Sequence, residues 1–240
     1  MSGLEKTISV IVLSYNVENH LHNAIDSVLR AIDEKFSDYE IIISDGGSSD
    51  KTMKIANKLA SENKKIKVVR NKNIGMGYSY LNGVEKASMN YVTMFPGDNE
   101  NSGFYFGKTL ERVGEADIIV PYTTNQNVRQ LHRKLISDGF VIFMNFLFNM
   151  KLKYYNGNCV YRTKDIRKLK IRSKDFAYNA EILIRLIKAG HDFVEIGIKI
   201  KPSHKTAIFK LNNIIGVLKT VLLLFYDVNI KNSIGGLLFN

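Results

Sequence analysis

The sequence predicts an α/β fold with a mostly parallel central sheet and helices on both faces. Two observations predict it. Short apolar segments rich in β-branched residues alternate four times with helical patterns in the first hundred residues, which is the order of a parallel sheet joined by helices. A polar cluster follows each of those four strands, and α/β proteins bind ligands at the edge where the carboxyl ends of the strands meet.

The strands are runs of apolar residues that stop at a turn or a polar cluster. Residues 8–14 are almost continuously apolar, as expected for a strand buried on both faces. The other expected strands cover residues 39–44, 66–69, 91–95, 117–120, 159–161 and 193–200.

The helices are segments whose apolar residues recur at a spacing of three and four. They are expected at residues 21–32, 51–62, 78–88, 103–113 and 175–189, with a further helix that contains Arg129, Arg133 and Ser137. Two strongly apolar runs complete the pattern, at residues 139–150 and 213–226.

Length and composition are those of one large globular domain. With 240 residues, 45% of them hydrophobic, the chain is long enough to bury a core. The single cysteine, Cys159, excludes an intrachain disulfide and indicates a reducing compartment. The first residues show no signal-peptide pattern, and no apolar run reaches the roughly 20 residues that span a bilayer. A cytoplasmic location is therefore expected.

The net charge of +11 is concentrated in the second half of the chain. Residues 1–126 hold 14 Lys and Arg against 16 Asp and Glu, whereas residues 127–240 hold 20 against 7. This asymmetry indicates an anionic partner. The basic residues are spread along amphipathic segments and form no block, which favours phosphate groups or an anionic membrane surface over nucleic acid.

The fourth strand ends in an acidic turn. Residues 91–100 read Y-V-T-M-F-P-G-D-N-E, so that Asp98 and Glu100 follow a strand that stops at Pro96-Gly97. Carboxylates at such a strand end suit a hard divalent cation that shares a substrate's phosphates. Taken alone, the turn favours a solvated acidic loop over a metal site.

The second strand ends in the glycine-rich loop of residues 45–50, D-G-G-S-S-D. Glycines allow close approach of the backbone to a ligand, and the loop also offers good helix caps. Neither the dinucleotide fingerprint nor the P-loop signature is present, which disfavours a Rossmann oxidoreductase. Taken alone, the loop is either a binding loop or a capped turn.

In combination the four clusters are more specific. Y-N-x-E follows the first strand, D-G-G-S-S-D-K-T the second, N-I-G with a later N-G the third, and P-G-D-N-E the fourth. Over residues 8–210 the chain resembles the family 2 glycosyltransferases, which have the GT-A fold, and is most similar to the dolichyl- or polyprenyl-phosphate mannose synthase branch.

The resemblance implies a nucleotide-sugar site and a metal site. The implied nucleotide-sugar contacts are Leu13, Tyr15, Asn16, Glu18, Asp45, Gly46, Asn73, Gly75, Asn82 and Gly97. Asp98 and Glu100 match the second and last positions of the family's D-x-D-x-Q/H metal segment, and imply Mg²⁺ or Mn²⁺ bound to the donor's diphosphate. Pro96 stands where the family has its first aspartate.

The resemblance also implies phosphate-binding residues on the second half of the chain. Arg129, Arg133 and Ser137 fit the family's R-x-x-x-R-x-x-x-S, and Lys210 is the residue retained from its R-x-x-G-x-S-K. Arginines four residues apart share one helix face and suit bidentate phosphate binding. In isolation, this spacing favours a solvated helix face.

The expected catalytic residues are Asp98 and an acid on the acceptor side. Glu181 matches that acid, and Asp175 is a second candidate. The alternative for Glu181 is an ion pair with Arg185 at a spacing of four. A phosphate acceptor is already an oxyanion and needs no strong base, whereas an alcohol acceptor does.

The apolar runs 139–150 and 213–225 are too short to span a bilayer. With basic neighbours, they fit interfacial helices on a membrane, and the alternative is core or homo-oligomer interface helices. We therefore expect a glycosyltransferase domain at residues 1–210 and an apolar helical tail at 211–240, peripheral on the inner face of the membrane.

The expected activity is inverting transfer from a GDP- or UDP-sugar to a polyprenyl phosphate. The alternatives are transfer to a hydroxyl of a glycan or lipid-linked saccharide, and a catalytically silent nucleotide-sugar-binding protein. The last alternative follows from Pro96 and from the weak match around Lys210.

Overall fold

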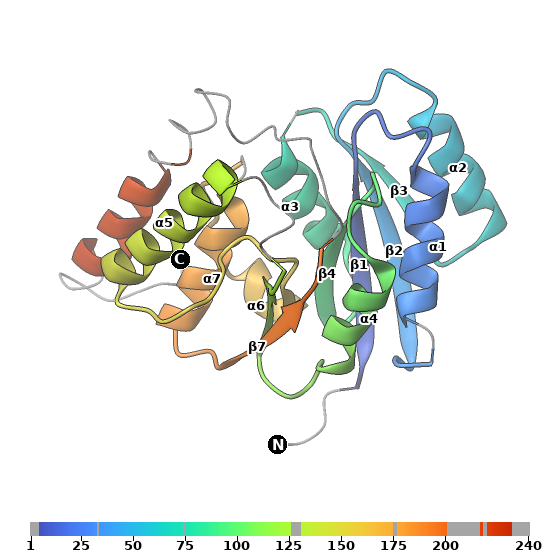
Figure 1. Ribbon diagram of the computed structural model, residues 1–240. Helices are drawn as coiled ribbons and strands as arrows, with labels where there is room; N and C mark the ends of the chain where they lie inside the picture. Colours follow the sequence, from blue (N-terminus) through green and yellow to red (C-terminus); the bar gives the residue numbers. More distant parts are fainter. Residues whose placement is uncertain are drawn as a thin grey trace.

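The computed structural model describes residues 5–32, 34–73, 75–125, 131–174, 177–200, 217 and 220–231, with the backbone alone at 131–133 and 230–231. Seven strands form one sheet in the order β3-β2-β1-β4-β6-β5-β7, with helices on both faces (Figure 1). Every strand pair is parallel except the two that β6 makes with β4 and β5. The mostly parallel sheet predicted from the sequence is confirmed.

The strands agree with the expected segments to within a few residues. They are β1 (Thr7–Ser14), β2 (Asp38–Asp45), β3 (Ile66–Arg70), β4 (Tyr91–Pro96), β5 (Ile118–Thr123), β6 (Val160–Arg162) and β7 (Phe193–Ile198). Because β6 is antiparallel to both neighbours, the carboxyl ends of the other six strands lie at one edge of the sheet.

The labelled helices are α1 (Leu21–Ile32), α2 (Thr52–Glu62), α3 (Met76–Lys86), α4 (Gly103–Glu111), α5 (Leu131–Phe148), α6 (Thr163–Arg167) and α7 (Tyr178–Lys188). Residues 220–231 form a C-terminal helix whose last six residues, Tyr226–Lys231, are the π-helical segment η2. Two buried cores result from the alternation of side chains along the central strands. Val10 and Val12 pack with α1, α2 and α4, whereas Ile11 packs with α3, α5, α7 and the C-terminal helix.

The second half of the chain differs from the expected pattern in two places. The described part of the helix expected around Arg133 and Ser137 continues into the apolar run at 139–150, and together they form one helix, α5. The short helix α6 follows β6 directly and carries no long apolar pattern of its own, which is why the sequence did not indicate it.

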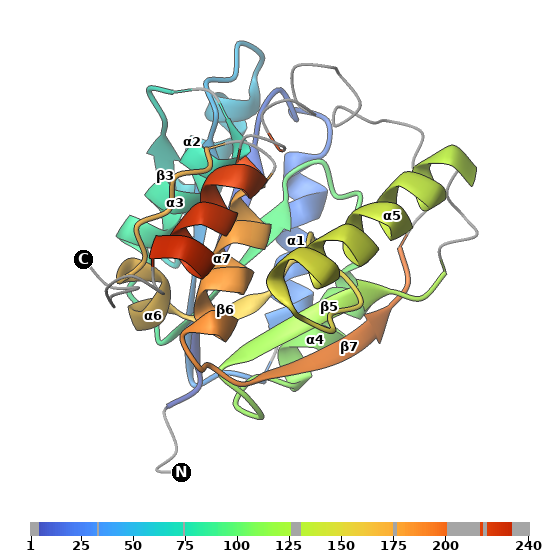
Figure 2. The same cartoon turned by 90° about the vertical axis from the view of Figure 1, so that its left-hand side faces the viewer.

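The described part of the expected tail shares the core of the main domain. Val221, Leu224 and Val228 are buried in the same cluster as α5 and α7, and the rings of Phe148 and Phe225 lie 6.3 Å apart. Figures 1 and 2 both show the C-terminal helix beside α5 and α7. The division at residue 210 stays a prediction, and these contacts argue that the described residues fold with the domain.

Alanine substitutions at two helical glycines are expected to change the stability of the protein in opposite directions. A Cβ atom on Gly83 would lie 2.6 Å from the side chain of Ile11 beneath it, so Gly83→Ala is expected to cost about 1–3 kcal/mol through overpacking. A Cβ on Gly107 meets Ala31 at 3.7 Å, so Gly107→Ala is expected to stabilise the protein by up to ~1 kcal/mol. Urea denaturation measures both, and equal effects would contradict the packing described.

Candidate functional site

The end of β1 holds the loops that follow its two neighbouring strands. The carbonyl oxygen of Ser14 accepts a hydrogen bond from the backbone N–H of Gly46, and that of Leu13 accepts one from Gly97, each at 2.8 Å. A Cβ on Gly97 would lie 2.6 Å from the Leu13 oxygen, so this position needs glycine. The glycine-rich loop and the acidic turn are therefore fixed side by side.

Asp45 organises the glycine-rich loop from inside. Its side chain is completely buried and accepts hydrogen bonds from the backbone N–H groups of Gly47 and Ser48 at 3.0 and 2.9 Å, and from the hydroxyls of Ser48 and Ser14. Four bonds occupy the lone pairs of a carboxylate. Asp45 therefore shapes the loop with a carboxylate that faces the protein, and its expected direct contact with the nucleotide stays a prediction.

The loop after β1 is bonded to the loop after β2. Asn16, which has a positive φ of 51°, accepts a bond from the backbone N–H of Ser49 at 2.9 Å, and Glu18 accepts one from Lys51 at 2.8 Å. Both expected contact residues thus join the two loops. Tyr15 stays 54% exposed beside them, so its ring is available to a flat ligand group.

The loop after β3 is held by Asn71, which the sequence did not single out. The side-chain amide of this buried residue lies within hydrogen-bonding distance of the Asp45 carbonyl and of the Ser44 and Ser79 hydroxyls. Its side-chain oxygen accepts a bond of 2.6 Å from Asn82. Asn82 therefore supports the loop from within, whereas Asn73 is exposed at its surface.

Gly75 and Gly77 are explained by a neighbouring chain segment. A Cβ on Gly75 would lie 2.8 Å from the carbonyl oxygen of Lys174, and a Cβ on Gly77 would lie 2.7–2.9 Å from the Lys174 backbone. Gly75 also has a positive φ of 144°, which favours glycine. The start of α3 is therefore covered by residues 171–174, the segment that precedes α7.

The acidic turn presents two carboxylates at the same edge. Asp98 is partly buried, Glu100 is exposed, and the backbone N–H of Glu100 donates to Oδ1 of Asp98 at 3.1 Å. Within the described ranges, no group of three or more His, Cys, Asp or Glu residues is arranged to hold a metal ion. Two carboxylates suit Mg²⁺ or Mn²⁺ when phosphate oxygens or water supply the remaining ligands, so the residues present fit such an ion. Pro96 ends β4 opposite Leu13.

Glu181 is buried in an ion pair. Its side chain is 1% exposed and lies 2.8 Å from Nη2 of Arg185. It also accepts a bond of 2.8 Å from the backbone N–H of Ser173. The ion pair that the sequence left open as the alternative is the observed arrangement, and the catalytic role of Glu181 stays a prediction.

The remaining expected residues are described only in part. Ser137 lies on α5 and is partly exposed, and the backbone of Arg133 lies one turn before it. Arg129, Asp175 and Lys210 fall outside the described residues, so their roles stay predictions.

The turn before β6 is built by Asn179, a second residue that the sequence did not single out. Its amide donates to the carbonyl oxygens of Tyr155 and Gly157 at 3.0 and 2.7 Å. A Cβ on Gly157 would lie 2.2 Å from the Pro121 oxygen, so this glycine is required. An asparagine inside an apolar helical pattern is the sequence signal that could have indicated this support.

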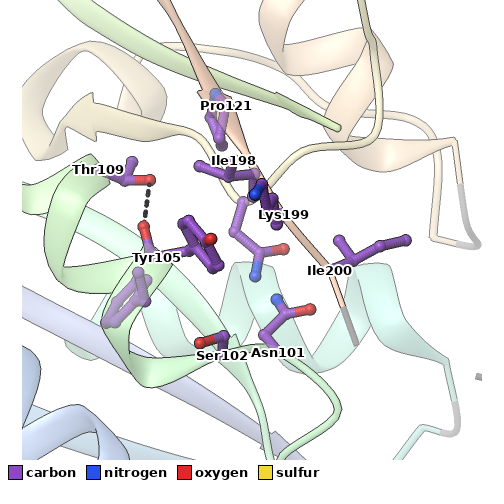
Figure 3. A pocket seen from close by; sticks show the side chains of 10 residues that line it. Asn101, Ser102, Tyr105, Thr109, Pro121, Ile198, Lys199 and Ile200 are labelled. Atoms are coloured by element: carbon purple, nitrogen blue, oxygen red, sulfur yellow. Dashed lines mark hydrogen bonds between the residues drawn. The ribbon is translucent and has the colours of Figure 1, made fainter. Parts of the chain in front are cut away.

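A shallow pocket lies on the other side of the acidic turn from the nucleotide loops. It has about 300 Å³ of space, open to solvent, between the start of α4 and the ends of β5 and β7. Figure 3 shows the labelled side chains around it: Asn101, Ser102, Tyr105, Thr109, Pro121, Ile198, Lys199 and Ile200. Asn101 follows Glu100 directly, so the pocket borders the candidate metal turn.

Cys159 is a structural residue. Burial raises the pKa of its thiol to about 11, so the thiol is protonated at neutral pH and is a poor nucleophile. The pKa of the neighbouring Tyr161 hydroxyl is also raised by burial.

The family model "Glycosyl transferase family 2" matches residues 9–170, more than half of the chain. The chain therefore belongs to glycosyl transferase family 2. The uncharacterized glycosyltransferase EpsJ of Bacillus subtilis is 32% identical over 114 residues, which cover 47% of this chain and 32% of that protein. The glycosyltransferase GlyA of Streptococcus pneumoniae is 27% identical over 141 residues, 57% of this chain and 20% of that protein. The chain spans about a third or less of the length of these relatives.

Solved structures show the same fold. Glucosyl-3-phosphoglycerate synthase from Mycobacterium tuberculosis, in complex with UDP, superposes with a TM-score of 0.70 at 16% identity and covers 92% of this chain and 80% of its own. The same enzyme in complex with Mn²⁺, UDP-glucose and phosphoglyceric acid gives the same values. The predicted GT-A fold is thereby confirmed.

Replacing Glu181 by Gln is expected to lower the free energy of unfolding by about 3 kcal/mol, because Arg185 loses a buried partner. The matched control is Glu111→Gln, which removes the exposed pair with Lys108 and is expected to cost less than ~1 kcal/mol. Denaturant unfolding measures both. Full stability of Glu181→Gln combined with loss of sugar transfer would contradict the structural role and support the catalytic one.

Proposed function

We propose that this chain is an inverting, metal-dependent glycosyltransferase that moves a sugar from a nucleotide-diphosphate donor, a UDP- or GDP-sugar, to a polyprenyl phosphate at a membrane surface. The observation that carries the proposal is the convergence of the three nucleotide loops and the acidic turn on the adjacent ends of β1 and β2. Membership of glycosyl transferase family 2 supports it. The M. tuberculosis neighbour crystallised with Mn²⁺ and UDP-glucose supports the donor and metal assignments.

The residues have distinct roles in this proposal. Tyr15 contacts the nucleotide base, and the loops that Asn16 and Glu18 hold contact the ribose. Asp98 and Glu100 hold Mg²⁺ or Mn²⁺, which when bound neutralises charge on the leaving diphosphate. Arg129, Arg133 and Lys210 bind phosphate groups of donor or acceptor. The acceptor oxygen forms its bond to the anomeric carbon on the face opposite the breaking bond, and the nucleoside diphosphate leaves with the electron pair.

The ion pair of Glu181 favours an acceptor that is already ionised. Arg185 and backbone N–H groups engage the Glu181 carboxylate, so its lone pairs are occupied within the protein. A phosphate monoester needs no strong base to attack. Asp175 remains the proposed base for an alcohol acceptor.

Membrane association is supported by exposed apolar side chains on two helices. We use the name α5–C-terminal surface for the large apolar side chains that α5 and the C-terminal helix expose: Leu135, Ile136, Ile142, Phe143, Phe146, Leu222, Leu223 and Tyr226. Among the described residues, no helix is long and apolar enough to cross a bilayer. The charge of +13 on residues 127–240 complements anionic lipid. We propose a peripheral location on the inner, cytoplasmic face of the membrane, with a homo-oligomer contact as the competing use of the same surface.

A second candidate function is transfer to a hydroxyl of a glycan or lipid-linked saccharide. The pocket beside the acidic turn favours it, because its amide and hydroxyl groups from Asn101, Ser102 and Asn158 suit sugar hydroxyls. A panel of polyprenyl phosphate and saccharide acceptors separates the two functions.

Asp98→Asn is expected to lower metal-dependent turnover of the donor sugar nucleotide by about a hundredfold or more, because a ligand that neutralises the leaving diphosphate is lost. Donor hydrolysis and sugar transfer, measured with Mn²⁺ and with Mg²⁺, check this result. Asp38→Asn is the control, since Asp38 lies at the opposite, amino end of β2 in an exposed pair with Lys65. Unchanged turnover and metal affinity in Asp98→Asn would contradict the metal role.

Ile142→Ser combined with Phe146→Ser is expected to weaken binding to vesicles of anionic lipid about tenfold or more, because two apolar side chains lose their burial in lipid. Vesicle sedimentation measures the partition. Phe104→Ser is the control, since Phe104 is 68% exposed on α4. Equal vesicle binding with a changed oligomeric state would assign the surface to contacts between copies.

A further inference from the structure

Residues 171–174, called the wall segment below, end at the start of α3, which borders the candidate donor site. Their last residue, Lys174, lies on the start of α3 so closely that Gly75 and Gly77 have no room for a Cβ atom. The ammonium group of Lys174 lies 5.6 Å from the centre of the Tyr78 ring on the same helix. The position of this segment therefore fixes the access to the start of α3, where the loop after β3 ends.

The segment is held by a carboxylate beneath it. Glu181 accepts hydrogen bonds from the backbone N–H groups of Arg172, at 3.2 Å, and Ser173, at 2.8 Å. Glu181 is itself paired with Arg185 on the next turn of α7. Its side chain is almost completely buried, so these bonds are shielded from water and salt.

A residue from the far end of the chain completes this arrangement. Asp227, on the C-terminal helix, lies 2.8 Å from Nη2 of Arg185 and 3.2 Å from Nη2 of Arg172. The Asp227 side chain is 9% exposed and that of Arg185 is 8% exposed. Asp227 thus forms an ion pair with the side chain of Arg172 in the wall segment. Through Arg185 it also supports the Glu181 carboxylate, which accepts hydrogen bonds from the backbone of that segment.

We propose that Asp227 is a positioning residue for donor binding. Among the residues that the structure describes, its printed partners are Arg172 and Arg185, neither of which is assigned to the donor or the metal. It acts by keeping residues 171–174 against the start of α3. The proposal rests on the proposed function, because it takes this edge of the sheet as the donor site. Loss of the Asp227 charge removes one of the two carboxylates that pair with Arg185, and it removes the ion pair of Arg172 with Asp227. The wall segment then gains conformational freedom, which donor binding must remove.

The test compares nucleotide affinity between two variants that each remove a buried carboxylate. Asp227→Asn is the test variant. Glu40→Gln is the matched control, because Glu40 is also buried and paired, with Lys67 at 2.6 Å, but lies toward the amino end of β2, away from the nucleotide loops. Isothermal titration with UDP and with GDP, each with Mn²⁺, gives the dissociation constants at a temperature where all proteins are folded.

Both variants are expected to lower the melting temperature. Only Asp227→Asn is expected to raise the dissociation constant, by roughly tenfold, with Asp227→Glu restoring most of the affinity. A purely structural role would lower stability and leave the affinity of the folded protein unchanged.

The outcomes separate this inference from the function on which it rests. If Asp227→Asn does not fold, Arg172→Gln tests the same link, because the Arg172 side chain is 49% exposed, and it is expected to weaken nucleotide binding as well. Wild-type affinity in these variants overturns the positioning role alone. Absence of UDP and GDP binding by the wild-type protein overturns the proposed function and the inference together.

Discussion

The candidate site depends on the two carbonyl groups at the end of β1. Leu13 and Ser14 accept the backbone N–H groups of Gly97 and Gly46, which fixes the acidic turn and the glycine-rich loop on either side of one strand. The register of the sheet explains this geometry, because Leu13 lies opposite Pro96 and Ser14 opposite Asp45. Both neighbouring strands therefore end level with β1, and their loops start at the same height.

The polar residues at this edge divide into two groups. Asp45 and Asn71 are buried and turn their hydrogen-bonding groups inward, so they give the loops their shape. Tyr15, Asp98 and Glu100 are exposed or partly exposed in the loops that follow β1 and β4. Rigid inner support for the groups that meet a ligand reduces the conformational entropy lost on binding. The wall made by residues 171–174 extends this principle, since its support comes from α7 and the C-terminal helix.

The parts of the fold that local pattern determines were predicted correctly. Continuous apolar runs and three-and-four spacing placed the strands and most helices, and the parallel order placed the polar clusters at one edge. The sequence predicted the pairing of Glu181 with Arg185 as one of two alternatives, because both residues lie on one helix. The sequence could not predict Asp227 as a further partner, because Asp227 lies 42 residues beyond Arg185 in the chain and only tertiary packing brings the two together. The same limit applies to Gly75 and Gly77, whose need for glycine comes from the backbone of Lys174.

Motif matching alone does not show which motif residues support the loops from within. Asp45 and Asn82 occupy motif positions, yet their side chains bond within the protein. The most direct measurement of the central claim is the thermal stability of the wild-type protein with a panel of UDP- and GDP-sugars, with and without Mn²⁺. Since a ligand at a hundred times its dissociation constant stabilises the native state by about 2.7 kcal/mol, a rise of several degrees is predicted for at least one nucleotide sugar, and a larger rise when Mn²⁺ is present. No shift with any nucleotide sugar in the presence of Mn²⁺ would contradict a donor site at the end of β1.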